Sequence, residues 1–506
     1  MIRVFATLLL VFSLSSALAE AQDKPTPGGL GLPPRAETQH AVALGDSRLD
    51  YRAIAEALPV RDAKGVETAS VFTVTYLVEP PAARQRPVAF LFNGGPGAAS
   101  VFLHLGAIGP RIMETPETGA VPRPPVRIVD NPATWLPFTD LVFIDPVGTG
   151  FSRGEGKEDN PDKPFWQLHA DLASLGAVVR LWLTRHQRWT SPVFLVGESY
   201  GGFRAAAMAR SLARDGGVVP SGLVLISPAL DTSVLHHSER DLIAAAVALP
   251  SYAAAAANFA GETGQRGGPA RDQGAVEQFA LSDYLVGLAQ LKGQPKPGDP
   301  FMSRVAQAIG LPEEIVRRHR GRVPSQIFAR EIRRAEGEVV SLYDATVTRP
   351  ARADEEDEAA GDPVLDNSIE AYTAAFESYA AEELAYRTDL PYRVLPREIS
   401  RQWDWQNAGS GEGGLGLALS SLEGALLAHP QTKVLIAHGR FDLVTPYLGS
   451  RWLIDQLAIP TALRESIGLR VYDGGHMVYT RPQSRAALAR DAAALFAPAS
   501  EPSGAN

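Results

Sequence analysis

The chain has 506 residues, of which 45% are hydrophobic and 21% are charged, a balance typical of a globular protein. Its formal net charge is −9 and it contains no cysteine. An acidic chain without a basic stripe is a poor nucleic-acid binder. The missing cysteines exclude disulfides, thiolate metal sites and a cysteine nucleophile.

Residues 1–21 are typical of a signal peptide. Arg3 supplies the positive charge, residues 4–14 are almost entirely apolar, and small residues at Ala17, Ala19 and Ala21 form overlapping cleavage sites. The apolar run is short for a membrane span, although an uncleaved anchor is the alternative. The sequence therefore predicts an exported protein, periplasmic or extracellular, without stable membrane insertion after signal removal.

Short apolar runs that end in Gly-rich or polar turns recur along the chain, and helical patterns lie between them. Continuous apolar strands suit a parallel sheet that is covered on both faces. The alternation of strands and helices predicts a doubly wound α/β fold with a mostly parallel sheet. The predicted strands lie at residues 70–78, 88–92, 141–144, 193–196, 223–226, 434–437 and 469–472.

The stretch 231–429 has few such runs and is rich in Ala, Glu, Arg and Leu. It predicts a mainly helical cap insertion, placed between a first core part at 22–230 and a second core part at 430–500. The acidic segment 354–358 inside it is typical of a solvated loop.

The run at 193–196 leads into Gly197-Glu198-Ser199-Tyr200-Gly201. A G-x-S-x-G turn between a strand and a helix projects its serine from the top of the sheet. The backbone N–H of Tyr200 would then lie at the start of a helix, where the dipole favours an anion. The alternative is an ordinary turn with a surface serine.

The loop Asn93-Gly94-Gly95-Pro96-Gly97 follows another predicted strand. A backbone N–H near Gly95 would join that of Tyr200 in an oxyanion hole, where each donor is typically worth roughly 3 kcal/mol. The alternative is a tight turn without function.

Asp442 and His476 each follow a predicted strand near the end of the chain. An α/β hydrolase supplies its catalytic residues in the order Ser, Asp or Glu, His. The carboxyl ends of parallel strands form the edge where such sheets assemble sites. The order Ser199, Asp442, His476 therefore predicts a triad; the alternatives are a helix cap for Asp442 and a structural loop histidine.

Glu198 directly precedes the predicted nucleophile. Once protonated, it could donate a hydrogen bond to a substrate carboxylate, and two carboxyl groups that share a proton raise an apparent pKa. An acidic optimum for binding peptide acids follows as a hypothesis. The alternative is a glutamate that complements the helix dipole.

Together these residues resemble the serine carboxypeptidases. That family has an N-G-G-P-G loop, a P-x-G-[TV]-G-[FY]-S segment, a G-E-S-Y-x-G motif and a G-H-M-V motif. Here they stand in the same order at residues 93–97, 146–152, 197–202 and 475–478. Many members also have a glutamate where this chain has Ala107, just before Gly109-Pro110. That glutamate belongs to the family's carboxylate-binding network.

The resemblance implies an α/β-hydrolase core with a helical cap and the removal of single residues from peptide C-termini. It requires no metal and no organic cofactor, and its partners are peptide substrates. By motif position it implies a triad of Ser199, Asp442 and His476, an oxyanion hole at Gly95 and Tyr200, and binding of the substrate carboxylate by Asn93 and Glu198.

Three functions are compatible with these residues. The first is a serine carboxypeptidase that works through an acyl-enzyme, best at acidic pH. The second keeps the machinery but acts as an esterase, an aminopeptidase or an acyltransferase, because fold and triad do not fix the substrate. The third is an exported binding protein without catalysis. The oligomeric state stays open.

Overall fold

The computed structural model describes residues 32–33, 35–79, 86–235, 241–262, 272–352, 361–405, 414 and 416–497. The predicted signal peptide and the acidic segment 354–358 lie outside these ranges.

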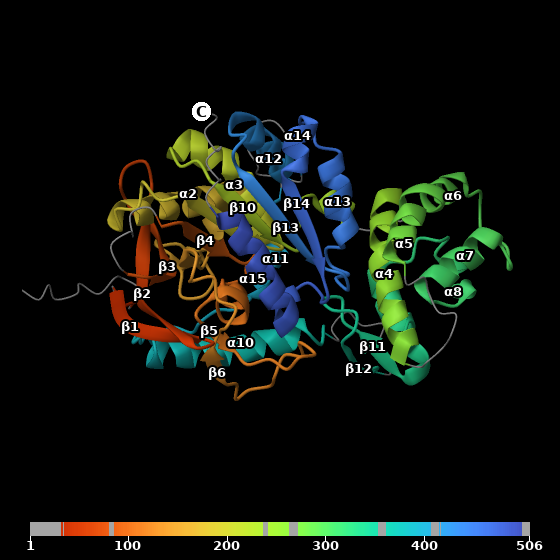
Figure 1. Ribbon diagram of the computed structural model, residues 1–506, viewed down its shortest axis with the longest axis horizontal. Coiled ribbons are helices and arrows are strands. Elements are labelled where there is room, and N and C mark those ends of the chain that lie inside the picture. The colour runs from red at the N-terminus through yellow and green to blue at the C-terminus, as the bar shows by residue number, and fades with distance from the viewer. Residues whose placement is uncertain are drawn as a thin grey trace, which may run out of the picture.

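A 10-stranded sheet with the order β1-β2-β3-β7-β4-β9-β10-β13-β14 organises the chain, with β8 paired beside β3 (Figure 1). Strands β7 to β14 of this order are parallel, and β1, β2 and β3 are antiparallel. The strands are β1 (Arg35–Leu44), β2 (Ser47–Arg61), β3 (Glu67–Leu77), β4 (Val88–Phe92), β7 (Asp140–Ile144), β8 (Arg153–Gly154), β9 (Val193–Glu198), β10 (Gly222–Ile226), β13 (Lys433–Gly439) and β14 (Ile467–Tyr472).

The predicted strands are confirmed because short apolar runs are buried on both faces of the parallel part. The α/β-hydrolase fold class is likewise confirmed by this sheet and its helices. The hairpin of β1 and β2 was not predicted. In β1, exposed residues alternate with half-buried ones. This is the pattern of an antiparallel strand with one face toward solvent.

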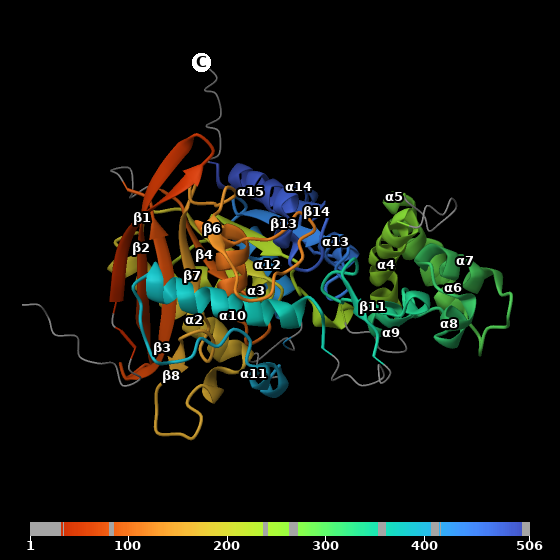
Figure 2. The same ribbon diagram turned by 90° about the horizontal axis from the view of Figure 1, so that it is seen from below.

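Helices cover both faces of the sheet (Figures 1 and 2). One apolar cluster joins one face to α2 (Leu168–Arg185), α3 (Tyr200–Gly216) and α12 (Leu417–Ala428). A second cluster joins the opposite face to α10 (Leu365–Glu382) and α15 (Pro482–Phe496).

The helices of the stretch 231–429 lie in two places. Figures 1 and 2 show a lobe beside the core, whereas α10 and α12 lie on the sheet. The physical reason is that α10 and α12 bury their apolar sides against the two faces of the sheet. The lobe consists of α4 (Leu242–Glu262), α5 (Gln273–Phe279), α6 (Leu285–Gln290), α7 (Pro300–Ile309), α8 (Glu313–Arg318), α9 (Ser325–Glu331), β11 (Glu338–Val340) and β12 (Thr348–Pro350).

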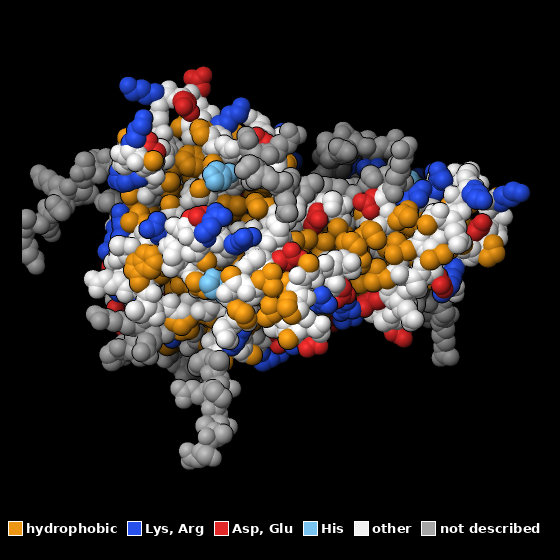
Figure 3. Space-filling view, turned by 90° about the horizontal axis from the view of Figure 1, so that it is seen from above, with side chains coloured by type: hydrophobic (Ala, Val, Ile, Leu, Met, Phe, Trp, Pro, Cys, Tyr) orange, Lys and Arg blue, Asp and Glu red, His pale blue; other side chains and the backbone are white. Residues whose placement is uncertain are grey.

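Helix α4 is the centre of this lobe. Residues 242–260 are long and apolar enough to cross a membrane, but 78% of that window is buried inside the protein, where α4 contacts α5, α6, α7 and α13 (Tyr447–Asp455). Figure 3 shows hydrophobic side chains on the outer surface of the lobe, and Val286 of α6 is among the exposed ones.

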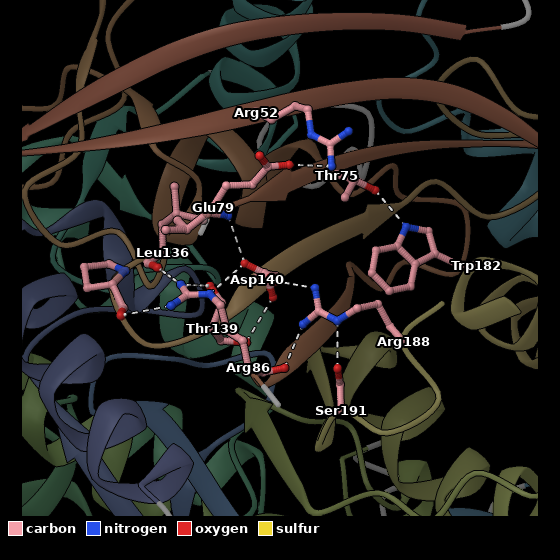
Figure 4. Close-up of polar contacts among 12 residues, drawn as sticks. Arg52, Thr75, Glu79, Arg86, Leu136, Thr139, Asp140, Trp182, Arg188 and Ser191 are labelled. Carbon is pink, nitrogen blue, oxygen red and sulfur yellow. Dashed lines mark hydrogen bonds and ion pairs between the residues drawn. The ribbon is translucent and has the colours of Figure 1, made fainter. Parts of the chain in front are cut away.

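The amino edge of the sheet is fixed by a buried charge network (Figure 4). Asp140, the first residue of β7, is fully buried. Its Oδ1 accepts from Arg86 Nε at 2.7 Å, and its Oδ2 accepts from Arg188 Nη1 at 2.6 Å. Because two cations and good geometry offset the loss of hydration, this network ties β7 to the segment that precedes β9.

Candidate active site

The carboxyl edge of the sheet holds Ser199 in a strained turn between β9 and α3. Its φ is 59°, a region that few residues other than glycine adopt and that marks functional turns. The backbone N–H of Ser199 donates to Ile226 O at 2.9 Å. Gly197 and Gly201 lack side chains where the turn folds on itself, because a Cβ on Gly197 would collide with the Gly201 carbonyl. The half-buried serine therefore sits above the sheet.

Asp442 and His476 lie in hydrogen-bond contact. His476 Nδ1 and Asp442 Oδ2 are 2.9 Å apart, and both residues are buried. Their strands β13 and β14 are neighbours. Ser227 directly follows β10, the strand between β9 and β13. It donates its hydroxyl to His476 O at 2.8 Å, which ties the histidine loop to the side where the nucleophile turn lies.

The electrostatics of this pair suit a general base. Burial alone would raise the pKa of Asp442, but the His476 imidazole and Thr445 outweigh it and hold the pKa below its ordinary value. Burial alone would lower the pKa of His476, but Asp442 outweighs it and raises the pKa. Because Nδ1 is engaged by the carboxylate, Nε2 is the nitrogen left to accept a proton.

Two residues that the sequence analysis missed hold the pair in place. Thr445 donates its hydroxyl to Asp442 Oδ2 at 2.6 Å and its backbone N–H to Oδ1 at 2.9 Å. The Tyr343 carbonyl accepts from the His476 N–H at 2.5 Å, and its ring meets the imidazole edge-on at 5.1 Å. Thr445 follows Asp442 by three residues and could have been suspected as its partner; Tyr343 comes from the insertion and gives no local signal.

The two predicted oxyanion donors belong to segments in direct contact. A Cβ on Gly94 would lie 2.5 Å from Tyr200 N, so the loop 93–97 packs against the start of α3. Gly95 has a φ of 100°, which glycine tolerates. The first N–H groups of α3 have no acceptor within the helix. This arrangement can stabilise an oxyanion beside Ser199.

Glu198 is almost fully buried at the same edge, with 3% of its surface exposed. Its Oε2 accepts from Asn93 Nδ2 and, at 2.7 Å, from the Tyr479 hydroxyl. Burial raises the pKa of Glu198 to about 7, although His476 and the two donors act in the opposite direction. The carboxyl is therefore protonated below neutrality.

Asn93 is held from both ends. Its Oδ1 accepts from the Leu103 N–H at 3.0 Å, and its carbonyl accepts from Arg204 Nη1 at 2.6 Å. Arg204 is fully buried and forms an ion pair with Asp171 of α2 at 2.7 Å. The backbone of Asn93 is thus held by Arg204, and its side-chain oxygen by Leu103, while Nδ2 donates to Glu198.

Ala107 lies buried in the π-helical turn His104–Ile108. Gly106, its neighbour, leaves room for two tyrosines, because a Cβ there would collide with the Tyr372 hydroxyl and lie 3.0 Å from Tyr479 Cε2. Among the described residues, no group of three His, Asp or Glu side chains is arranged to hold a metal.

Comparison with known protein families finds a match in the first half of the chain. The model of the serine carboxypeptidase family matches residues 67–216. A likeness to the serine carboxypeptidase family is thus found for this part of the chain. The matched segment runs from β3 to α3 and contains Asn93, Glu198 and Ser199, whereas Asp442 and His476 lie beyond it.

A curated family member, serine carboxypeptidase-like 51 of Arabidopsis thaliana, is 34% identical over 140 residues. That match spans 27% of this chain and 27% of the plant protein.

The solved structures that match this chain are more distant in sequence. Esterase E22 is 14% identical, with 88% of this chain and 100% of that chain covered and a TM-score of 0.38. Haloalkane dehalogenase DatA from Agrobacterium tumefaciens C58 is 13% identical, with coverages of 88% and 97% and a TM-score of 0.35.

Proposed function

We propose that the protein is a serine carboxypeptidase that removes single residues from peptide C-termini. Ser199 attacks the carbonyl of the last peptide bond, His476 Nε2 accepts the hydroxyl proton, and Asp442 holds the Nδ1–H tautomer. The N–H groups of Gly95 and Tyr200 stabilise the tetrahedral oxyanion. His476 then protonates the leaving amine, and water releases the acyl group from Ser199 by the same route.

The observation that carries this proposal is the buried carboxyl of Glu198. It directly precedes the nucleophile and is hydrogen-bonded to Asn93. A protonated carboxyl and an amide can both donate to a carboxylate, which is the group that distinguishes a peptide terminus from an internal peptide. Deprotonated Glu198 would repel the same group. This is why we expect peptide acids to be cleaved best on the acidic side of neutrality.

A second candidate is an esterase that uses the same triad. Ala107, where many family members have a glutamate, favours it because one carboxyl of the family's carboxylate-binding network is missing. An exported location, proposed from residues 1–21, is compatible with both candidates. Amino-terminal sequencing of the protein from the periplasm would test it by looking for a start after residue 19 or 21.

A substrate panel decides between the two. The substrates are an N-acylated Phe-Leu acid, its C-terminal amide and a simple acyl ester, each with wild type and Ser199→Ala. The proposal predicts release of free leucine from the acid, much slower attack on the amide, and no reaction with the variant. Ser199-dependent ester cleavage without leucine release would contradict the carboxypeptidase and leave the esterase.

A further inference from the structure

Tyr479 contacts the buried carboxyl beside the nucleophile, and none of the motifs assigned it a role. It follows His476 by three residues, in the short turn Val478–Thr480, and its side chain is fully buried. Its hydroxyl donates to Glu198 Oε2 at 2.7 Å. Its own carbonyl accepts from Arg485 Nη1 at 3.1 Å, which fixes the turn.

The two oxygens of Glu198 have different surroundings. Oε2 accepts from both Asn93 and Tyr479, whereas none of the described residues donates to Oε1. The tyrosine hydroxyl and the amide N–H both donate hydrogen bonds. Because Oε2 already accepts two of them, a proton bound to Oε2 would compete with these donors. The acidic proton therefore belongs on Oε1, the oxygen left for a ligand.

We propose that Tyr479 is a positioning residue that keeps Glu198 Oε2 unprotonated and so directs the carboxyl proton, on Oε1, toward the substrate's terminal carboxylate. The substrate part of this inference rests on the proposed carboxypeptidase function; the placement of the proton does not. Tyr479 thereby provides one of the contacts that a second carboxyl would provide, and its ring lies beside Gly106.

Other groups also act on this carboxyl, and all of them are kept in Tyr479→Phe. Asn93 faces it from the loop after β4, and the charges of Asp442 and His476 reach it from the loops after β13 and β14. The charge of Glu198 in turn helps to raise the pKa of Tyr343 and of Tyr372, on α10, but neither hydroxyl donates to the carboxyl.

Tyr372 offers a matched control. Like Tyr479 it is fully buried and lies against Gly106. Its hydroxyl, however, has no hydrogen-bond partner among the described residues. Tyr372→Phe and Tyr479→Phe therefore remove the same atom from neighbouring positions, but only the second removes a donor from Glu198.

The test measures the proton on Glu198 directly and without substrate. Infrared difference spectra over a pH titration report the protonated carboxyl, and the band of Glu198 is the one absent in Glu198→Gln. Loss of a donor to the charged form raises a pKa. We expect Tyr479→Phe to move the midpoint upward by on the order of one pH unit, and Tyr372→Phe to leave it unchanged.

A midpoint in Tyr479→Phe equal to that of wild type would overturn the inference, and so would an equal shift in both variants. If Tyr479→Phe does not fold, 3-fluorotyrosine placed at position 479 keeps the ring and donates more strongly. The midpoint should then move downward, and an unmoved midpoint overturns the inference. Failure of the proposed function would appear elsewhere, as a wild type that does not distinguish peptide acids from amides.

Discussion

Asp140 at the amino edge of the sheet and Asp442 at the carboxyl edge are both fully buried, but their partners differ. Asp140 is held by the guanidinium groups of Arg86 and Arg188 (Figure 4), whose charge is permanent. Asp442 is held by backbone N–H groups, a hydroxyl and the imidazole of His476. The two arginines neutralise the charge of Asp140, whereas His476, among the partners of Asp442, can gain and lose a proton.

Glu198 extends the contrast. Its direct partners, Asn93 and Tyr479, are uncharged donors, and burial raises its pKa to about 7. A buried carboxyl between two arginines fixes strands in place, whereas a buried carboxyl among neutral donors titrates close to working pH. For these three carboxyls, burial alone does not separate the structural one from the two at the active edge; the charge of their partners does.

The same substitution at both aspartates sharpens this comparison. Asp442→Asn leaves the packing intact but favours the wrong histidine tautomer, so kcat should fall by about 10⁴. The activity is measured with the N-acylated Phe-Leu acid and compared with Ser199→Ala, which sets the floor. A fall of less than about tenfold would contradict the role of Asp442 as the residue that orients His476.

Asp140→Asn should behave in the opposite way. It leaves two arginines without a counter-charge, and breaking a buried ion pair costs about 3 to 5 kcal/mol of unfolding free energy. The kcat and KM of the folded enzyme should stay close to wild type, since the network lies at the far edge of the sheet. Urea unfolding measures the free energy of unfolding. A lower kcat without a loss of stability would contradict the structural role of Asp140.

Thr445→Val tests a smaller effect within the active edge. The change keeps the shape of the side chain but removes the hydroxyl that donates to Asp442 Oδ2. A hydrogen bond to a charged group contributes about 1.5 to 3 kcal/mol, so we expect kcat/KM to fall by roughly ten- to hundredfold. Unchanged kcat/KM would show that the backbone N–H groups alone hold Asp442.

The sequence predicts the parts of this molecule whose signal is local. The strand at 88–92 is recognisable because a short apolar run enters a glycine turn, and Ser199 because its turn needs glycines at fixed places. Contacts between residues that are far apart in the sequence have no local sequence signal. Tyr343 reaches His476 from more than a hundred residues upstream in the chain, and α10 covers the sheet although its segment resembles the rest of the insertion.

The pairing of Tyr479 with Glu198 lies between these cases. Tyr479 directly follows the G-H-M-V motif, but nothing in the sequence shows that its side chain turns into the space beside Gly106. The antiparallel hairpin of β1 and β2 was also hard to predict from the sequence. Strand β1 alternates between exposed and half-buried residues and carries polar side chains on both sides, so no apolar run indicates it.

The most direct test of the account is the ratio of kcat/KM for the N-acylated Phe-Leu acid to kcat/KM for its amide, measured against pH in wild type and in Glu198→Gln. The titration of His476 cancels in this ratio. A carboxyl with a raised pKa is protonated below that pKa, so the wild-type ratio should stay level at acidic pH. Above the Glu198 pKa of about 7 it should fall about tenfold per pH unit.

In Glu198→Gln the amide stays neutral, so its ratio should not change with pH. A wild-type ratio that does not fall with pH, or an equal fall in Glu198→Gln, would contradict the claim that the buried carboxyl beside Ser199 recognises the peptide terminus.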